Sequence, residues 1–129
     1  MKISVILPAF NERLNLLAII PEINEVLVGE GFQPSDVEII VVDDSSSDGT
    51  LEALQTLHLK SLQVLSNTYT KGLASSLRCG IEAARGEMIL VMDSDYNHDP
   101  RQIPALIRAL GSEDCVVGSR FLPGGRMAD

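Results

Sequence analysis

Five short apolar segments recur along this chain and alternate with four segments of helical periodicity. The apolar segments cover residues 2–7, 37–42, 62–66, 88–92 and 114–119. The helical segments cover residues 14–27, 51–59, 72–84 and 100–110. The apolar segments are continuous runs rather than alternating ones, which predicts strands buried on both faces of a sheet. The sequence therefore predicts an α/β fold: an open, mostly parallel sheet with helices on both faces.

Four residues inside these segments carry further expectations. Pro21 either kinks the first helix or begins a second one, because proline lacks a backbone donor. Gly80 costs roughly 1 kcal/mol relative to Ala inside a helix, and its small size allows a close helix contact. Both cysteines, Cys79 and Cys115, are predicted to be buried free thiols, with Cys115 in the last strand.

Length and charge limit the class of protein. The chain has 129 residues, of which 45% are hydrophobic, and a formal net charge of −8. This length supports one domain, residues 1–129, with its own core. The acidic balance argues against nucleic-acid binding, which needs Lys and Arg to neutralise phosphates, and against a polybasic membrane contact. The chain shows no signal-peptide layout and no apolar run near the ~18 residues of a spanning helix, so we expect a cytoplasmic protein.

The fourth apolar segment ends in a cluster of polar residues. Asp93 and Asp95 follow it directly, and Asn97 comes next. Two carboxylates one residue apart at the exit of a buried strand repel each other unless a cation lies between them. Oxygen ligands suit Mg²⁺ or Mn²⁺, which often keep positions for substrate phosphates. The alternative is that these residues only start the next helix, since Asp99-Pro100 is a good helix beginning.

Polar residues follow the other predicted strands as well. The residues at these strand ends are Pro8, Phe10, Asn11 and Glu12 after the first strand, Asp43 and Asp44 after the second, Asn67 and Lys71 after the third, and Ser119 and Arg120 after the fifth; all but Pro8 and Phe10 are polar. Open α/β sheets bind ligands outside the carboxyl ends of their strands. The chain lacks both G-x-G-x-x-G and the P-loop pattern, so no glycine-rich loop cradles phosphates. The Asp43-Asp44 pair either accepts hydrogen bonds from a ribose or base, or caps the turn before the next helix.

Several spaced motifs resemble the family 2 glycosyltransferases of the GT-A fold, and among them the dolichyl-phosphate and polyprenyl-phosphate mannosyl- and glucosyltransferases. Residues 7–12 read LPAFNE, residues 41–50 read VVDDSSSDGT, and residues 71–73 read KGL. Residues 92–100 read MDSDYNHDP, and residues 117–121 read VGSRF. The matching motifs occur in the family's order and span nearly the whole chain. The resemblance implies a Rossmann-like nucleotide-diphospho-sugar transferase domain.

The resemblance also implies a role for each matching residue. The nucleotide of a GDP-mannose or UDP-glucose type donor would contact Pro8, Phe10, Glu12, Asp43, Asp44, Lys71 and Asp93. Mg²⁺ or Mn²⁺ would be held by Asp93, Asp95 and Asn97, and the catalytic residues would be Asp95 and Arg120, with Arg120 reaching a donor or acceptor phosphate. The reaction would transfer a hexose with inversion, and the acceptor would be a polyprenyl or dolichyl phosphate at the membrane surface.

The chain departs from the family pattern in three ways. Phe10 replaces a tyrosine, and Ser45 replaces a glycine, which tightens the backbone constraint if that position needs a positive φ. Family members also continue past residue 129, some with membrane helices, so the chain is expected to be a truncated donor-binding part, membrane-associated only through segments it lacks. Missing sheet edges would favour homo-oligomers. The alternatives are a nucleotide-binding-only fragment and a phosphotransfer receiver-like domain with a phosphorylated Asp44.

Overall fold

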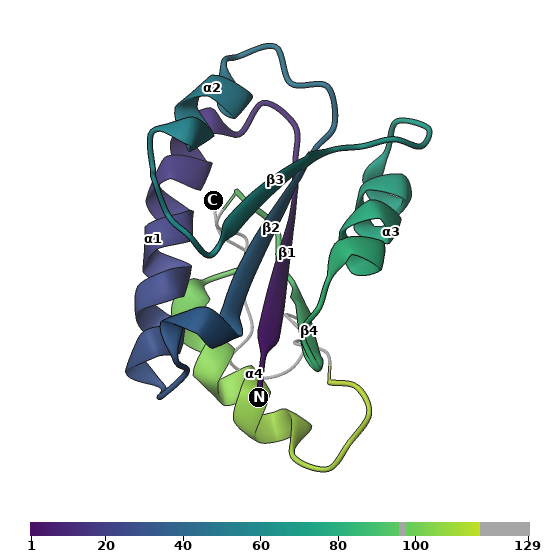
Figure 1. The fold of residues 1–129 in the computed structure, drawn as a ribbon. Helices are drawn as coiled ribbons and strands as arrows, with labels where there is room; N and C mark the ends of the chain where they lie inside the picture. Colours follow the sequence, from purple (N-terminus) through teal and green to yellow (C-terminus); the bar gives the residue numbers. More distant parts are fainter. Residues whose placement is uncertain (96–97, 117–129) are drawn as a thin grey trace.

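Four parallel strands form the sheet at the centre of the molecule. The computed structural model describes residues 1–95 and 98–116 (Figure 1). The strands are β1 (Ile3–Ala9), β2 (Val37–Asp43), β3 (Leu62–Ser66) and β4 (Met88–Val91), in the order β3-β2-β1-β4. Ile3 of β1 lies opposite Val37 on one side and Met88 on the other. The predicted parallel α/β sheet is therefore confirmed.

Helices cover both faces of this sheet, as predicted. Helices α1 (Arg13–Gly29), α2 (Thr50–Gln55) and α4 (Ile103–Leu110) lie on one face, and α3 (Leu73–Ala83) lies on the other (Figure 1). Short 3₁₀ turns precede β2 and α4, at Pro34–Asp36 and Pro100–Gln102. No helix within the described parts of the chain is long and apolar enough to cross a membrane.

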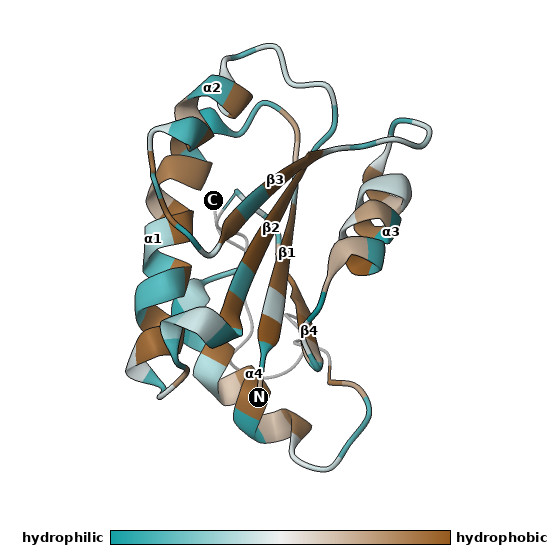
Figure 2. Cartoon of the chain, in the orientation of Figure 1, coloured by the Kyte–Doolittle hydropathy of each residue, from teal (hydrophilic) through white to brown (hydrophobic). Residues whose placement is uncertain are grey.

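The core is built from the two faces of β1 and β2. Hydrophobic residues run along the strands, while the helices are mixed in character (Figure 2). Side chains of Ile3, Val5 and Leu7 pack with α1, α2 and α4, whereas Ile6 and Val42 pack with α3. Burying each such side chain contributes roughly 1.5–3 kcal/mol. The two central strands thus pack against both layers of helices, and this packing also fixes the position of the strand ends.

The fourth strand differs from its prediction. β4 was expected to be buried on both faces, but it lies at the edge of the described sheet. Met88 and Leu90 pack into the core, whereas Ile89 and Val91 are 44% and 41% exposed. The reason is that α3 packs over β1 and β2 rather than over β4. A continuous apolar run therefore did not mean burial on both faces here.

Other differences concern element ends. The predicted helix over residues 51–59 stops at Gln55, and His58 has a positive φ of 47° that is incompatible with a helix. One helix runs through Pro21, so no second helix begins there. Residues 114–116 form no strand, and the rest of the predicted fifth strand lies outside the described residues.

The two thiols also differ from their prediction. Cys115 is exposed rather than buried, because residues 114–116 do not join the sheet. Cys79 on α3 is half-buried, and its Sγ lies 3.7 Å from the carbonyl oxygen of Ser66. Both thiols are free.

Two glycines allow α3 to pack closely on the sheet and the connection before β4 to pass close to β1. A Cβ on Gly80 would lie 2.5 Å from Cγ2 of Ile6 and 3.2 Å from Cγ2 of Val42. A Cβ on Gly86 would lie 2.6 Å from the backbone nitrogen of Ser4. The close packing expected of Gly80 is confirmed, and it brings the first turn of α3 next to the end of β1.

A buried carboxylate fixes the connection between α3 and β4. Glu38 Oε2 accepts hydrogen bonds from the Ser4 hydroxyl (2.6 Å) and the Arg85 backbone N–H (2.9 Å). The Ser4 Oγ in turn accepts a bond from Gly86 N–H (2.8 Å). Burial alone would raise the pKa of Glu38, but these hydrogen bonds and the charges of Lys2 and Arg85 outweigh it, so the pKa is lowered.

Candidate functional site

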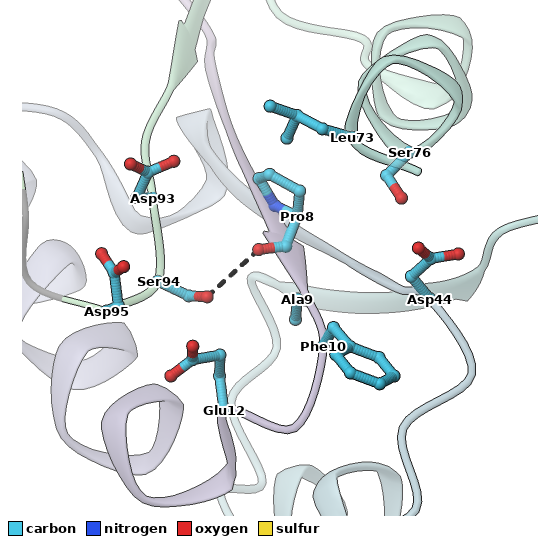
Figure 3. A pocket seen from close by; sticks show the side chains of 10 residues that line it. All are labelled: Pro8, Ala9, Phe10, Glu12, Asp44, Leu73, Ser76, Asp93, Ser94 and Asp95. Carbon is cyan, nitrogen blue, oxygen red and sulfur yellow. Dashed lines mark hydrogen bonds between the residues drawn. The ribbon is translucent and has the colours of Figure 1, made fainter. Parts of the chain in front are cut away.

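A polar pocket of about 270 Å³ lies at the carboxyl ends of β1 and β4. The chain places β2 and β3 on one side of β1 and then β4 on its other side, so the strand order switches between β1 and β4. Open α/β sheets bind ligands at such a switch point. Ten residues line the pocket: Pro8, Ala9, Phe10, Glu12, Asp44, Leu73, Ser76, Asp93, Ser94 and Asp95 (Figure 3). Six of these belong to the predicted donor-binding or metal sets: Pro8, Phe10, Glu12, Asp44, Asp93 and Asp95.

Carboxylates occupy two sides of this pocket. Glu12, Asp93 and Asp95 lie on one side and Asp44 on the other, with the end of β1 between them (Figure 3). No lysine or arginine is among the lining residues of the described chain. Like charges gathered at one edge repel each other unless a cation or hydrogen-bond donors compensate them. The pocket therefore favours a ligand that arrives with a cation or with several donor groups.

The segment after β4 is tied back to β1. Ser94 is buried, and its hydroxyl donates to the Pro8 carbonyl oxygen at 3.1 Å (Figure 3). The backbone N–H of Asp93 donates to Nδ1 of His98 at 2.9 Å, and Nε2 of His98 lies 4.0 Å from Asp93 Oδ2. His98 is therefore a loop residue that supports the Asp93 backbone.

The predicted metal ligands are only partly within the described chain. Asp93 and Asp95 both line the pocket, but Asn97 and Arg120 lie outside the described residues. Across residues 1–95 and 98–116, no group of three or more His, Cys, Asp or Glu side chains is arranged to hold a metal ion. A magnesium site needs only one or two carboxylates when phosphates and waters complete it. The donor set of Asp93 and Asp95 thus fits a metal that arrives with a diphosphate.

The loop after β1 interlocks with the turn after β2. The Asn11 N–H donates to the Ser46 hydroxyl at 2.9 Å, and the Ser47 N–H donates to Asn11 Oδ1 at 2.8 Å. Asn11 has a positive φ of 52°, and Ser45 has a positive φ of 66°. The backbone constraint expected at Ser45, where the family has glycine, is therefore confirmed. These bonds hold Phe10 at the pocket, where its side chain stays 45% exposed.

Asp43 and Asp44 have different surroundings. Asp43 is buried outside the lining set; its Oδ2 accepts from the Ser46 N–H at 3.1 Å, and its Oδ1 has no hydrogen-bond partner among the described residues. Asp44 lines the pocket, and its backbone N–H donates to the Ala9 carbonyl oxygen at 2.9 Å. The geometry of Asp43 matches the turn-capping alternative, whereas Asp44 is in position to contact a ligand.

Helix α2 begins close to the same turn. Asp48 accepts a bond from the Thr50 N–H at 3.1 Å and another from the Thr50 hydroxyl, while Gly49 occupies the N-cap position. Asp48 Oδ2 also accepts from the Arg13 N–H at 3.2 Å. The hydrogen bonds to Thr50 and Arg13 lower the pKa of Asp48, against a smaller opposing effect of burial. The start of α1 and the start of α2 are thereby joined below the pocket.

The loop of residues 67–72 is hydrogen-bonded to the pocket residue Asp44. Asp44 Oδ1 accepts from Asn67 Nδ2 at 3.0 Å, and Asp44 Oδ2 accepts from the Gly72 N–H at 3.0 Å. Lys71 does not line the pocket, but its Nζ lies 3.8 Å from the centroid of the Phe10 ring. The loop therefore brings Lys71 and Phe10 together, although they are far apart in sequence.

Sequence reasoning missed four lining residues. They are Ala9, Leu73, Ser76 and Ser94. Ser94 had a signal, since it separates the two predicted metal ligands. Ser76 is fully buried on the first turns of α3 and reaches the pocket only because this helix packs tightly on β1, which no local pattern indicates.

A parallel sheet with a polar pocket where its strand order reverses defines a Rossmann-like ligand-binding domain. More specifically, the chain belongs to glycosyltransferase family 2, because the model of the family described as "Glycosyl transferase family 2" matches residues 4–127. A dolichol-phosphate mannosyltransferase from Pyrococcus furiosus is 41% identical over 129 residues, which are 98% of this chain and 35% of that protein. The chain thus spans about a third of the length of this relative.

Solved structures agree with this assignment. A mannosyltransferase from Pyrobaculum calidifontis, in complex with GDP-Man and Mn²⁺, is 26% identical with a TM-score of 0.66; the match covers 85% of this chain and 32% of that one. Glucosyl-3-phosphoglycerate synthase from Mycobacterium tuberculosis, in complex with Mn²⁺, UDP and glucosyl-3-phosphoglycerate, is 26% identical with a TM-score of 0.68; the match covers 84% of this chain and 39% of that one. The fold is therefore that of the GT-A nucleotide-sugar transferases.

Proposed function

We propose that this chain is the donor-binding part of a metal-dependent, inverting glycosyltransferase. The donor is a nucleotide-diphosphate sugar of the GDP-mannose or UDP-glucose type, and the transferred group is a hexose. One observation carries the proposal: the pocket at the end of β1 has an exposed aromatic ring and Asp44 at one end and the Asp93 and Asp95 carboxylates at the other. A nucleoside and a metal-bound diphosphate need these two environments at opposite ends of one site.

The nucleoside would lie against Phe10 and Asp44. The half-exposed Phe10 ring offers a flat apolar surface for a base or ribose, and the Asp44 carboxylate offers acceptors for their N–H or O–H groups. Pro8 and Glu12 complete the proposed nucleotide contacts, Pro8 from the end of β1 and Glu12 from the side of the pocket that holds Asp93 and Asp95. Asp43 would contribute to nucleotide binding indirectly, because its Oδ2 accepts from the Ser46 N–H and so stabilises the turn next to Asp44.

The diphosphate would lie near Asp93 and Asp95. Mg²⁺ or Mn²⁺ would be held by Asp95 with Asp93 and Asn97, and when bound it would neutralise charge on the leaving diphosphate. Arg120 would contact a donor or acceptor phosphate. Asp95 and Arg120 are therefore the proposed catalytic residues, and their task is to hold the diphosphate in line for displacement. A phosphate acceptor is already a nucleophile, so no strong general base is required.

The acceptor proposal rests on the relatives. The Pyrococcus protein is named a dolichol-phosphate mannosyltransferase, and a Micrococcus luteus protein that is 34% identical is named an undecaprenyl-phosphate mannosyltransferase. A polyprenyl or dolichyl phosphate is therefore the proposed acceptor, met at the cytoplasmic surface of a membrane. The exposed Ile89 and Val91 at the edge strand would favour homo-oligomers of the isolated chain.

A binding-only function is the second candidate. The chain covers 35% of the Pyrococcus relative, and the pocket of about 270 Å³ is smaller than the roughly 300–1,000 Å³ of typical ligand sites. A nucleotide would then bind without sugar transfer. Nucleoside-diphosphate binding with Mn²⁺, combined with no release or transfer of the sugar from GDP-mannose or UDP-glucose, would select this candidate.

The test is calorimetric titration of the chain with GDP and UDP, with and without Mn²⁺. Asp95→Ala should remove the Mn²⁺-dependent part of the affinity, about tenfold or more for one charged ligand lost, while Asp44→Ala should weaken binding with and without Mn²⁺. Asp36→Ala is the matched control, because Asp36 lies directly before β2, at the amino ends of the strands and away from the pocket. Unchanged affinity of the Asp95 variant at saturating Mn²⁺ would refute the metal site.

A further inference from the structure

Asn67 is the centre of a hydrogen-bond network that reaches two pocket-lining residues, Asp44 and Ser76. Its Nδ2 donates to Asp44 Oδ1 (3.0 Å) and to the Thr70 carbonyl oxygen (3.1 Å), and it lies 3.4 Å from Ser76 Oγ. Its Oδ1 accepts from the Tyr69 N–H at 3.0 Å. Asn67 itself does not line the pocket. One amide side chain thus connects the end of β3, the loop of residues 67–72, helix α3 and the pocket carboxylate.

This network determines how the Asp44 carboxylate is presented. Asp44 is almost fully buried, and each of its oxygens accepts one bond from the loop, from Asn67 Nδ2 and from the Gly72 N–H. An ionised carboxylate has about four lone-pair sites, so about two remain for a ligand. Two donors fixed on one loop prevent rotation of the carboxylate and orient those remaining sites.

We propose that Asn67 is a positioning residue of the donor site, which orients Asp44 to accept a hydrogen bond from the nucleoside. The inference rests on the proposed function, since it assigns a task to Asp44 in nucleotide binding. Asn67 acts through Asp44 and does not touch the nucleotide. The same network also holds the loop that places Lys71 over Phe10, so both sides of the nucleoside end depend on Asn67.

A second anchor of the loop provides a control. On the outer surface, the Tyr69 hydroxyl donates to Glu82 Oε2 at 2.6 Å, and Arg78 bonds to the same carboxylate and lies over the Tyr69 ring. The hydrogen bond from Tyr69 and the bond from Arg78 lower the pKa of Glu82. This anchor does not involve Asp44. Tyr69→Phe therefore removes a bond of the outer anchor and keeps both donors to Asp44.

The decisive variant is Asn67→Asp, which has nearly the same shape. It replaces the Nδ2 donor with an oxygen about 3.0 Å from Asp44 Oδ1. Two carboxylates this close repel each other, and the pair retains a proton as the pH falls, which restores a donor. Besides Asp44, the charged group on the same loop is Lys71, the neighbouring turn contributes Asp43, and α3 contributes the half-buried Cys79 thiol and Glu82. Asn67→Ala removes the donor at every pH.

The experiment measures affinity for whichever of GDP and UDP wild type binds more tightly, for its monophosphate, and for pyrophosphate with Mn²⁺. We expect Asn67→Asp to weaken the nucleotide and the monophosphate about tenfold at neutral pH and to approach wild type near about pH 5. Asn67→Ala should weaken them at both pH values. Pyrophosphate binding should not change, and Tyr69→Phe should bind nucleotide like wild type.

Asn24→Asp is the control for the chemical change. Asn24 on α1 accepts a bond from the Ser61 hydroxyl, which lies just before β3 and therefore at the amino ends of the strands. Equal nucleotide affinity in both Asn67 variants and wild type would overturn the inference but leave the proposed function standing. An equal loss in Tyr69→Phe, or a loss of pyrophosphate binding, would reduce Asn67 to a structural role. Wild type that binds neither GDP nor UDP would overturn the proposed function itself.

Discussion

Gly80→Ala should destabilise the protein although it removes a glycine from a helix. Helix propensity favours alanine by about 1 kcal/mol. Against this, the new Cβ would lie 2.5 Å from Cγ2 of Ile6, about 1 Å closer than the roughly 3.5–4.0 Å of a good carbon contact. Ile6 is fully buried and its β-branched side chain has little rotamer freedom. Overpacking of this kind costs about 1–3 kcal/mol, so we expect a net loss of about 1 kcal/mol.

The assay is urea denaturation followed by circular dichroism, with Gly29→Ala as the matched control. Gly29 is the last residue of α1, and nothing lies within 4 Å of the position of its Cβ. The control should therefore gain a few tenths of a kcal/mol, up to about 1. Because a displaced α3 would also move Leu73 and Ser76 at the pocket wall, Gly80→Ala should weaken the proposed nucleotide binding as well. A Gly80 variant as stable as wild type would refute the close-packing argument.

Two further variants test the electrostatics and the backbone. Glu38→Gln should lower the free energy of unfolding by about 1 kcal/mol at neutral pH, since it weakens the bonds from Ser4 and Arg85. The folded-state pKa of Glu38 is lowered from 4.5, so the stability that its carboxylate contributes is present above the unfolded-state pKa and is lost as the pH falls through the folded-state pKa. A stability difference between Glu38→Gln and wild type that persisted at the lowest pH would contradict this reasoning. Ser45→Gly should raise the thermal midpoint, since the exposed Ser45 has a φ of 66° that costs an L-residue about 1–2 kcal/mol; a lower midpoint would show that the serine side chain contributes more than its backbone costs.

Much of the fold followed from local patterns. The ends of β1, β2, β3 and β4 were predicted to within two residues, because an apolar run bounded by turn residues leaves few alternatives. The parallel arrangement followed from the same runs. The edge position of β4 did not, because the exposure of Ile89 and Val91 depends on which strands α3 covers.

The candidate site was predicted in part for a similar reason. Parallel strands place their carboxyl ends at one edge, so the sequence alone brought Phe10, Glu12, Asp44, Asp93 and Asp95 toward one pocket, and all five line it. Their assignment to nucleotide, metal or catalysis remains a prediction.

The residue types and their periodicity determined where the elements lie and at which edge the polar residues gather, because these depend on the chain's local preferences. Only the tertiary structure decided which side chains meet: Asn67 with Asp44, Lys71 with Phe10, and Gly80 with Ile6. Such pairs join segments that are distant in sequence, and their contacts depend on the order of the strands and on the distance at which each helix packs, neither of which a local pattern contains.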